Sequence, residues 1–313
     1  RFLKDGERIF EVSEHKKTER FNTPVLSSFA ERTRAYMKIE DGCDRYCTYC
    51  IIPTARGSVR SKPLAEIATE AETLSRAGFS EIVLVGINLT SYGKGENTDI
   101  CDAVAAAAKP DGIKRVRLGS LEPDHISDNV LERLKAQKKF CPQFHLSLQS
   151  GCDETLKRMN RHYDTAFYRD LVSRIRAVFE DASITTDVMV GFAGETEEEF
   201  SKSLAFVKEI GFAKTHVFAY SRRRGTVAYG LPAQITRAEK AERSRRMIET
   251  ALACEEEFLK GLVGKTEYVL FETAEKGFAE GYTPNYSRVR VKSDEPHTGE
   301  ILPVKIISAE KEC

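Results

Sequence analysis

Three cysteines lie within eight residues of the chain, Cys43, Cys47 and Cys50, with the spacing C-x3-C-x2-C. Clustered thiolates in a chain of this length indicate a metal or redox site rather than a disulfide framework. Zinc sites usually take four protein ligands, and no fourth cysteine or histidine lies nearby in the sequence. Three thiolates instead hold three corners of a 4Fe-4S cluster and leave one iron open to another ligand. We therefore expect such a cluster, with a zinc site completed by a distant residue, or incidental cysteines, as the alternatives.

The remaining cysteines are scattered, and we assign them no chemistry. We expect them to be small buried residues or incidental surface thiols. They are Cys101, Cys141, Cys152, Cys254 and Cys313. No secretory signal precedes the cysteine cluster, so we expect a reducing, cytoplasmic location.

The elements that would position the cysteines alternate between strand and helix from residue 36 onward. The β-rich runs are 36–39, 81–85, 115–118, 144–148, 184–190 and 215–220. The helical stretches are 63–77, 99–108, 124–136, 166–179 and 195–210, and Thr196 with Glu199 forms a capping box at the start of the last one. Six successive β/α units predict an α/β fold with a partial (β/α)6 barrel. The cysteines follow the first strand, at the end where such folds build active sites.

The pattern of the sequence changes after a long charged helix expected at 236–260. Short strands at 265–272, 277–282, 286–291 and 301–307 are separated by turn residues. This spacing predicts a small antiparallel β-barrel and a second domain that begins near Gly261.

Composition narrows the class of protein. The chain of 313 residues carries 48 Lys and Arg against 48 Asp and Glu, and 41% of its residues are hydrophobic. These values exclude a disordered, collagen-like or coiled-coil chain. No run approaches the roughly 18 apolar residues that span a bilayer, so we expect no membrane partner. Neutral charge argues against a broad nucleic-acid-binding field, but local basic patches remain, such as residues 222–224.

Several segments in order resemble the radical S-adenosylmethionine (SAM) methylthiotransferases. They are 42–57 (GCDRYCTYCIIPTARG), 60–61 (RS), 85–93 (VGINLTSYG), 117–123 (RLGSLEP), 144–151 (FHLSLQSG), 156–161 (LKRMNR) and 187–195 (DVMVGFAGE). The resemblance runs from Tyr36 onward and implies a radical SAM core over 36–235, a connecting helix over 236–260 and an OB-like TRAM RNA-binding domain over 261–313.

The resemblance also implies the cofactors. Cys43, Cys47 and Cys50 would ligate one 4Fe-4S cluster, whose open iron would bind SAM through its amino and carboxylate groups. One electron from a flavodoxin- or ferredoxin-type donor would cleave SAM to methionine and a 5'-deoxyadenosyl radical.

Other residues in the matching segments would contact SAM. Four polar residues lie at or just past predicted strand ends and would converge on its ammonium and ribose: Asn88, Ser120, Glu122 and Gln149. Tyr49 would lie near the adenine, with packing in the core as the alternative. Arg161 and Lys157 would neutralise the SAM carboxylate, or else be solvated charges on a helix.

Asp187 is also a candidate SAM contact because it lies inside an apolar strand. A buried carboxylate is unfavourable unless it is paired or hydrogen-bonded. We expect a functional role for Asp187, with a structural pair as the alternative.

The resemblance is greatest to the branch that adds a methylthio group to C2 of N6-threonylcarbamoyladenosine beside the tRNA anticodon. Other branches act on isopentenyladenosine in tRNA or on a ribosomal-protein aspartate, and a zinc-stabilised RNA-binding module is the non-enzyme alternative. The terminal domain would grip the anticodon arm through Arg288, Arg290, Tyr282 and Tyr286.

The chain also departs from the family pattern. Family members commonly have prolines where this chain has Ala193 and, within residues 221–226, Arg222. They also have an N-terminal domain with a second 4Fe-4S cluster. The chain begins at Arg1, and its first 35 residues are polar. We expect residues 1–35 to be a linker or a remnant of that domain, and this chain to cleave SAM without completing methylthiolation.

Overall fold

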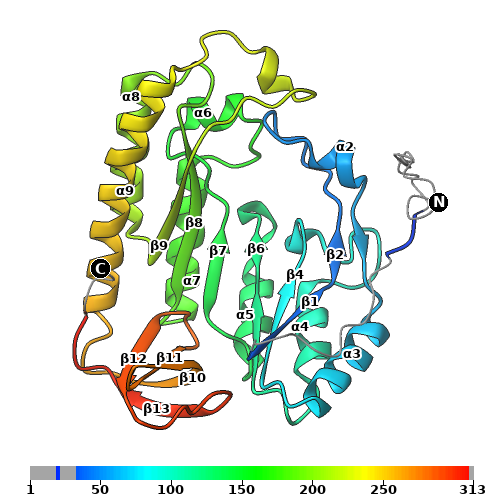
Figure 1. Ribbon diagram of the computed structural model, residues 1–313. Helices are drawn as coiled ribbons and strands as arrows, with labels where there is room; N and C mark the ends of the chain where they lie inside the picture. Colours follow the sequence, from blue (N-terminus) through cyan, green and yellow to red (C-terminus); the bar gives the residue numbers. More distant parts are fainter. Residues whose placement is uncertain (1–18, 22–32, 310–313) are drawn as a thin grey trace, which may run out of the picture.

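The computed structural model of the protein describes residues 19–21 and 33–309. Parallel strands form two adjoining sheets, with the orders β1-β4-β5 and β6-β7-β8-β9. Gly119 alone separates β5 from β6, so the two sheets continue each other as one curved wall (Figure 1). The strands are β1 (Arg34–Lys38), β4 (Glu81–Val85), β5 (Arg115–Leu118), β6 (Ser120–Leu121), β7 (Gln143–Leu146), β8 (Ser183–Val190) and β9 (Lys214–Ala219). The α/β fold is confirmed, and all the predicted strand runs form.

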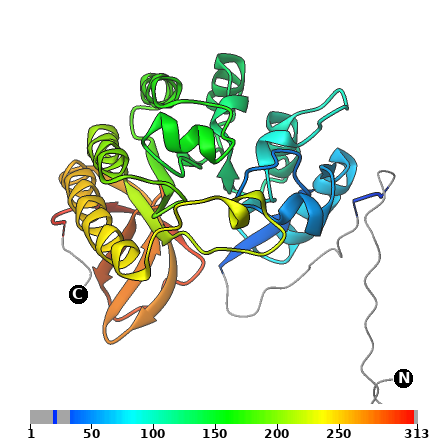
Figure 2. The same cartoon turned by 90° about the horizontal axis from the view of Figure 1, so that it is seen from above.

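Helices cover the outer, convex face of this wall (Figure 2). Their apolar faces pack on the sheet in one continuous core. They are α3 (Leu64–Arg76), α4 (Ile100–Ala108), α5 (Asp128–Ala136), α7 (Thr165–Val178), α8 (Glu197–Ile210) and α9 (Arg237–Lys260). The capping box of Thr196 and Glu199 is present at the start of α8.

One predicted helix begins later than expected. Residues 123–125 form a separate 3-10 turn, η2 (Pro123–His125), and α5 starts only at Asp128. The hydroxyl of Ser127 caps α5 by accepting a hydrogen bond from the backbone N–H of Val130 at 3.4 Å. Ser127 therefore provides the helix start that residue 124 was expected to mark.

Several short elements were not predicted because they contain too few residues for a periodic pattern. They surround the cysteine loop and the strand ends. They are β2 (Glu40–Asp41), α2 (Ile52–Arg56), β3 (Arg60–Ser61), η1 (Leu89–Ser91), α6 (Asp153–Arg158) and η3 (Val227–Gly230).

The C-terminal strands form an antiparallel sheet in the order β12-β11-β10-β13. Within residues 266–305 the outer strands β12 and β13 do not pair with each other, so these strands form an open, curled sheet rather than the closed barrel that we expected. The strands are β10 (Thr266–Glu275), β11 (Phe278–Tyr282), β12 (Arg288–Lys292) and β13 (Ile301–Lys305).

This sheet packs on the end of the parallel wall where the strands begin, opposite the cysteine loop (Figure 1). Arg117 donates hydrogen bonds to the buried Glu81 carboxylate at 3.0 Å and to the carbonyl of Pro284 at 2.8 Å. Ser183, the first residue of β8, donates to the carbonyl of Asn285 at 2.6 Å. The loop between β11 and β12 thus closes one end of the parallel wall.

No helix in the described part of the chain is both long enough and apolar enough to cross a membrane.

Candidate active site

The cysteine loop starts at Gly42, directly after β2. Gly42 has φ +88, and a Cβ there would lie 2.1 Å from the carbonyl oxygen of Ser58. Only glycine fits this position, because the backbone conformation and the close approach both exclude a side chain. The next amide, that of Cys43, donates to the carbonyl of Gly57 at 3.1 Å. The segment after the loop therefore fixes where the loop begins.

The end of α6 holds the middle of the loop. The backbone N–H of Thr48 donates to the carbonyl of Met159 at 3.0 Å. The Thr48 hydroxyl donates to the backbone carbonyl of Arg158 at 2.9 Å. The Asn160 side chain donates to the carbonyl of Tyr46 at 3.0 Å. These contacts give the 156–161 segment a positioning role.

The segment around η3 completes the support of the loop. Seen from above, it reaches across the open side of the wall toward α2 (Figure 2). The amide of Ala228 donates to the carbonyl of Thr48 at 2.8 Å. The cysteine loop is thus held by segments distant in the sequence, which preorganises its thiols.

All three cysteines of the loop are free thiols, with Cys47 buried and the other two partly buried. Burial raises the pKa of Cys43 to about 11 and also raises the pKa of Cys50. Both thiols are therefore protonated at neutral pH, and a bound metal must displace their protons. A guanidinium N–H of Arg161 donates to the sulfur of Cys47 at 3.1 Å. The side-chain amide nitrogen of Asn88 lies 4.0 Å from the sulfur of Cys43. Such donors stabilise thiolates bound to a metal.

The spacing of the three sulfurs bears on the kind of metal group. Tetrahedral zinc holds thiolate sulfurs about 3.8 Å apart, given Zn–S bonds of about 2.3 Å. Among the described residues, the three cysteine sulfurs do not form a group compact enough to hold a single ion. The three thiols as they lie are therefore not arranged around a single ion.

Arg161 lies at the centre of the site, and its side chain is 3% exposed. It pairs with the carboxylate of Glu122 and donates to the hydroxyl of Tyr49 at 3.3 Å and to that of Tyr163 at 3.0 Å. The alternative that Arg161 is a solvated helix charge is wrong, because burial and pairing fix its guanidinium. Lys157, by contrast, is exposed.

The other predicted SAM contacts lie at the strand ends. Asn88 is buried and donates to the hydroxyl of Ser91 at 2.8 Å. The hydroxyl of Ser120 lies 3.2 Å from that of Ser147. Gln149 has φ +68, and its amide donates to the carbonyl of Asp187 at 2.8 Å. These contacts order the strand ends.

Tyr49 packs in the apolar core, and Asp187 lies near a histidine of the neighbouring strand. The ring of Tyr49 meets that of Phe192 edge-on, with centroids 6.4 Å apart, in a small apolar cluster. Burial raises the pKa of Tyr49 well above its usual value. A carboxylate oxygen of Asp187 lies 3.5 Å from Nε2 of His145.

Sequence reasoning missed Glu40. Its carboxylate is fully buried and accepts a hydrogen bond from the backbone N–H of Asn88 at 2.7 Å. Burial raises its pKa to about 7. A Cβ on Gly86 would lie 2.6 Å from a Glu40 oxygen, so the glycine makes room for this contact. An acidic residue directly after a buried strand was the available signal.

The residues predicted to contact RNA in the terminal sheet also make contacts within the chain. Tyr282 and Tyr286 stack with centroids 4.7 Å apart, and the guanidinium of Arg34 lies 4.9 Å from each ring. Arg288 and Arg290 both pair with the carboxylate of Glu280. The stacked tyrosines therefore belong to the junction with the parallel wall.

The basic run at 222–224 lies on the other side of the molecule, beside the cysteines. All three of its arginines are exposed. A Cβ on Gly225 would lie 3.2 Å from the Ile51 side chain, next to Cys50. Burial raises the pKa of Cys50, and the charge of Arg223 offsets a small part of that rise.

Comparison with known proteins places the chain in a family. A family model of the radical SAM superfamily matches residues 37–207. The chain is 36% identical over 319 residues to threonylcarbamoyladenosine tRNA methylthiotransferase MtaB of Bacillus subtilis (strain 168), across 98% of this chain and 70% of that protein. The chain belongs to the radical SAM methylthiotransferases. Its cofactors are accordingly a 4Fe-4S cluster and SAM.

Two further relatives extend the comparison. The MtaB enzyme of Thermotoga maritima is 37% identical, across 92% of this chain and 66% of that protein. The tRNA-2-methylthio-N(6)-dimethylallyladenosine synthase of Symbiobacterium thermophilum is 38% identical, across 88% of this chain and 61% of that protein. This methylthiotransferase chain thus spans about two thirds of the length of these relatives.

Solved structures agree on the fold. Methylornithine synthase superposes with a TM-score of 0.51 and 15% identity, covering 70% of this chain and 62% of that one. Coproporphyrinogen III oxidase of Escherichia coli, a radical SAM enzyme, gives a TM-score of 0.50 and 18% identity, covering 74% of this chain and 54% of that one.

Proposed function

We propose that this methylthiotransferase acts on tRNA and adds a methylthio group to C2 of N6-threonylcarbamoyladenosine. The observation that carries the proposal is the match across 98% of the chain to a relative named for that nucleoside. A second relative with that name matches across 92% of the chain. Relatives named for dimethylallyladenosine are equally similar in identity but match 88% of this chain, so that nucleoside is the second candidate.

We further propose that Cys43, Cys47 and Cys50 ligate the cluster. Their loop is rigidly held, and N–H groups from Asn88 and Arg161 face two of the sulfurs. The cluster and SAM supply the radical chemistry when they are bound. The chain orients them and excludes water.

The residues proposed to contact SAM are those predicted from the sequence. They are Asn88, Ser120, Glu122, Gln149, Tyr49, Arg161 and Asp187. Arg161 is assigned a positioning role within this set, because its guanidinium links Glu122 to Cys47. Glu40 fixes the loop that carries Asn88. Burial of these groups in a low dielectric strengthens each of their charge interactions.

The tRNA anticodon arm is proposed to approach the cysteine side of the barrel. The exposed arginines at 222–224 lie there and provide positive charge for RNA phosphates. The same charge suits an acidic one-electron donor of the flavodoxin or ferredoxin type. The C-terminal sheet is proposed to be a TRAM-like domain that contacts RNA through its outer face, where Arg290 and Lys292 are exposed.

Cluster ligation is tested by anaerobic reconstitution followed by iron and sulfide analysis and EPR with and without SAM. We expect about four irons per chain and a spectrum that shifts when SAM is added. Cys47→Ala should lose the cluster, whereas Cys101→Ala, a buried cysteine of α4, should keep it. Stoichiometric zinc without sulfide would contradict the proposal and leave the RNA-binding module.

The substrate is tested with the reconstituted chain, SAM, a reductant and anticodon stem-loops that differ only in the modified adenosine. We expect more 5'-deoxyadenosine with threonylcarbamoyladenosine RNA than with dimethylallyladenosine RNA. The reverse order would transfer the assignment to the second candidate.

A further inference from the structure

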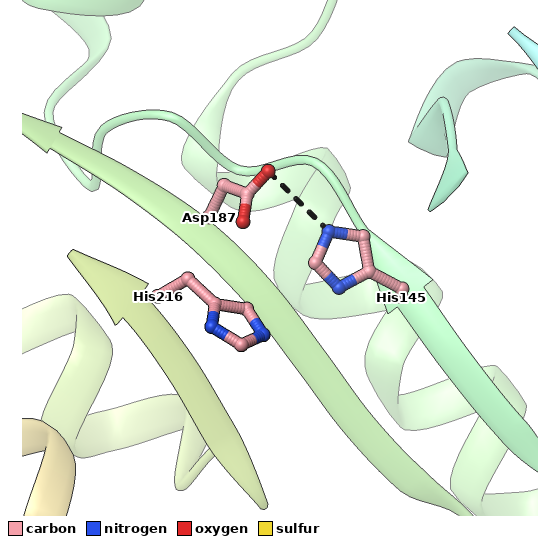
Figure 3. A group of neighbouring side chains, drawn as sticks. All are labelled: His145, Asp187 and His216. Carbon is pink, nitrogen blue, oxygen red and sulfur yellow. Dashed lines mark ion pairs between the residues drawn. The ribbon is translucent and has the colours of Figure 1, made fainter. Parts of the chain in front are cut away.

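Two histidines and one aspartate gather on the concave side of the parallel wall, each from a different strand. His145 lies on β7, Asp187 on β8 and His216 on β9 (Figure 3). Asp187 pairs with His216 across the two strands, and His145 pairs with Thr185, two residues before Asp187. Because strand side chains alternate, all three lie on one face of the sheet. The opposite face carries the apolar core under the helices, with Phe144 next to His145.

The distances within this group suit an ion better than a direct contact. The ligand atoms of the three side chains all lie within 4.8 Å of one another. Nε2 of His145 and the nearer oxygen of Asp187 are 3.5 Å apart, which is long for a hydrogen bond. A tetrahedral metal with ligand bonds of about 2.05 Å separates its ligands by about 3.3 Å. His216 is exposed, and its imidazole is the third ligand group within this range.

A second contact orients His145 as metal-binding histidines are oriented. Its Nδ1 lies 3.0 Å from the hydroxyl of Thr185, and that hydroxyl also accepts from the side chain of Gln143 at 3.2 Å. With its hydrogen on Nδ1, His145 donates to Thr185, and the lone pair on Nε2 faces Asp187. Such a partner on the remote ring nitrogen fixes the tautomer of a metal ligand.

We propose that His145, Asp187 and His216 bind a divalent first-row transition metal ion. Two imidazoles and one carboxylate form a ligand set used for zinc and for ferrous iron, and they leave further coordination positions open. Those positions face the concave side of the wall. Asp187 also belongs to the proposed SAM-contacting set, so the ion would lie beside those contacts. No cysteine takes part, so this site is separate from the thiol loop.

The test uses the full chain with Cys43, Cys47 and Cys50 all replaced by Ser, so that the thiol loop cannot bind added metal. Cobalt(II) is titrated in and followed by visible absorption. We expect one cobalt per chain, with the bands of nitrogen and oxygen ligands and without a sulfur-to-cobalt charge-transfer band. Binding should also raise the thermal unfolding midpoint, because the ion binds only the folded chain.

Variants in this background separate the site from adventitious binding. Thr185→Val should weaken cobalt binding by about 10-fold through loss of orientation. Asp187→Asn keeps the side-chain shape but removes a charged direct ligand, so it should weaken binding by more than Thr185→Val does. His297→Gln removes a histidine of the C-terminal sheet and should change nothing. Absence of the bands, or bands that survive in Asp187→Asn, would overturn the proposal. Either result leaves the assignment of the thiol loop untouched.

Discussion

The pair of Arg161 and Glu122 tests whether the site depends on buried charge. Arg161→Met removes the guanidinium and leaves the Glu122 carboxylate, 13% exposed, without its closest partner. Breaking a buried ion pair from one side costs about 3 to 5 kcal/mol. Arg45 lies 3.9 Å from Glu122 and still offsets part of its charge. We therefore expect a loss of unfolding free energy near the lower limit, about 3 kcal/mol.

The assay is denaturant unfolding of the metal-free chain in a double-mutant cycle with Glu122→Gln. If the two groups interact as the structure shows, the double variant should be more stable than the sum of the single losses predicts, by at least about 1 kcal/mol. Arg169→Met is the matched control, because Arg169 pairs with Glu209 at the surface and should matter little. Additive losses, within about 0.5 kcal/mol, would refute the reasoning.

The same variant should also change the cluster. Arg161 places a positive charge and an N–H group beside the sulfur of Cys47. Both favour the reduced, more negative state of the cluster. Arg161→Met should therefore lower the reduction potential in an EPR redox titration. An unchanged potential would mean that Arg161 acts only as a structural residue.

Two further predictions concern other buried charges. Glu40 has its pKa raised from 4.5 to about 7 in the folded protein, so ionisation favours unfolding. Stability should fall by about 3 kcal/mol as pH rises from 4.5 through 7, and Glu40→Gln should flatten that part of the curve in unfolding measurements across pH. Arg117→Met leaves the Glu81 carboxylate paired with Arg115 alone and removes the hydrogen bond to the carbonyl of Pro284. Because that bond attaches the C-terminal sheet to the wall, limited proteolysis should cut the variant near Gly261 faster than the unchanged protein.

Much of the fold followed from the sequence, because strands and long helices carry periodic patterns. The runs at 81–85 and 115–118 match β4 and β5 at both ends. The short elements were missed for a physical reason. Helix α6 has six residues, and its position depends on hydrogen bonds to the distant cysteine loop rather than on local propensity.

The chemistry of the site was predicted less completely than the fold. The cysteine spacing identified the loop, because ligand spacing is a local property. The pairing of Arg161 with Glu122 joins residues 39 positions apart, and no local pattern encodes it. The contacts of Tyr282 and Tyr286 within the chain were not predicted, for a related reason. Their rings lie beside Arg34 and Arg117 of the parallel wall, which are distant in the sequence.

Buried charged residues lie at both ends of the curved wall, and the residues at the two ends have different structural roles. At the end where the strands begin, Arg117 and Glu81 join the C-terminal sheet to the wall. At the end where the strands finish, Arg161 and Glu40 hold the thiol loop and the Asn88 loop. The C-terminal sheet is therefore attached to the end of the wall remote from the cysteines. In the proposed function, an RNA that contacts that sheet while its adenosine reaches the cysteine side therefore runs along the length of the wall.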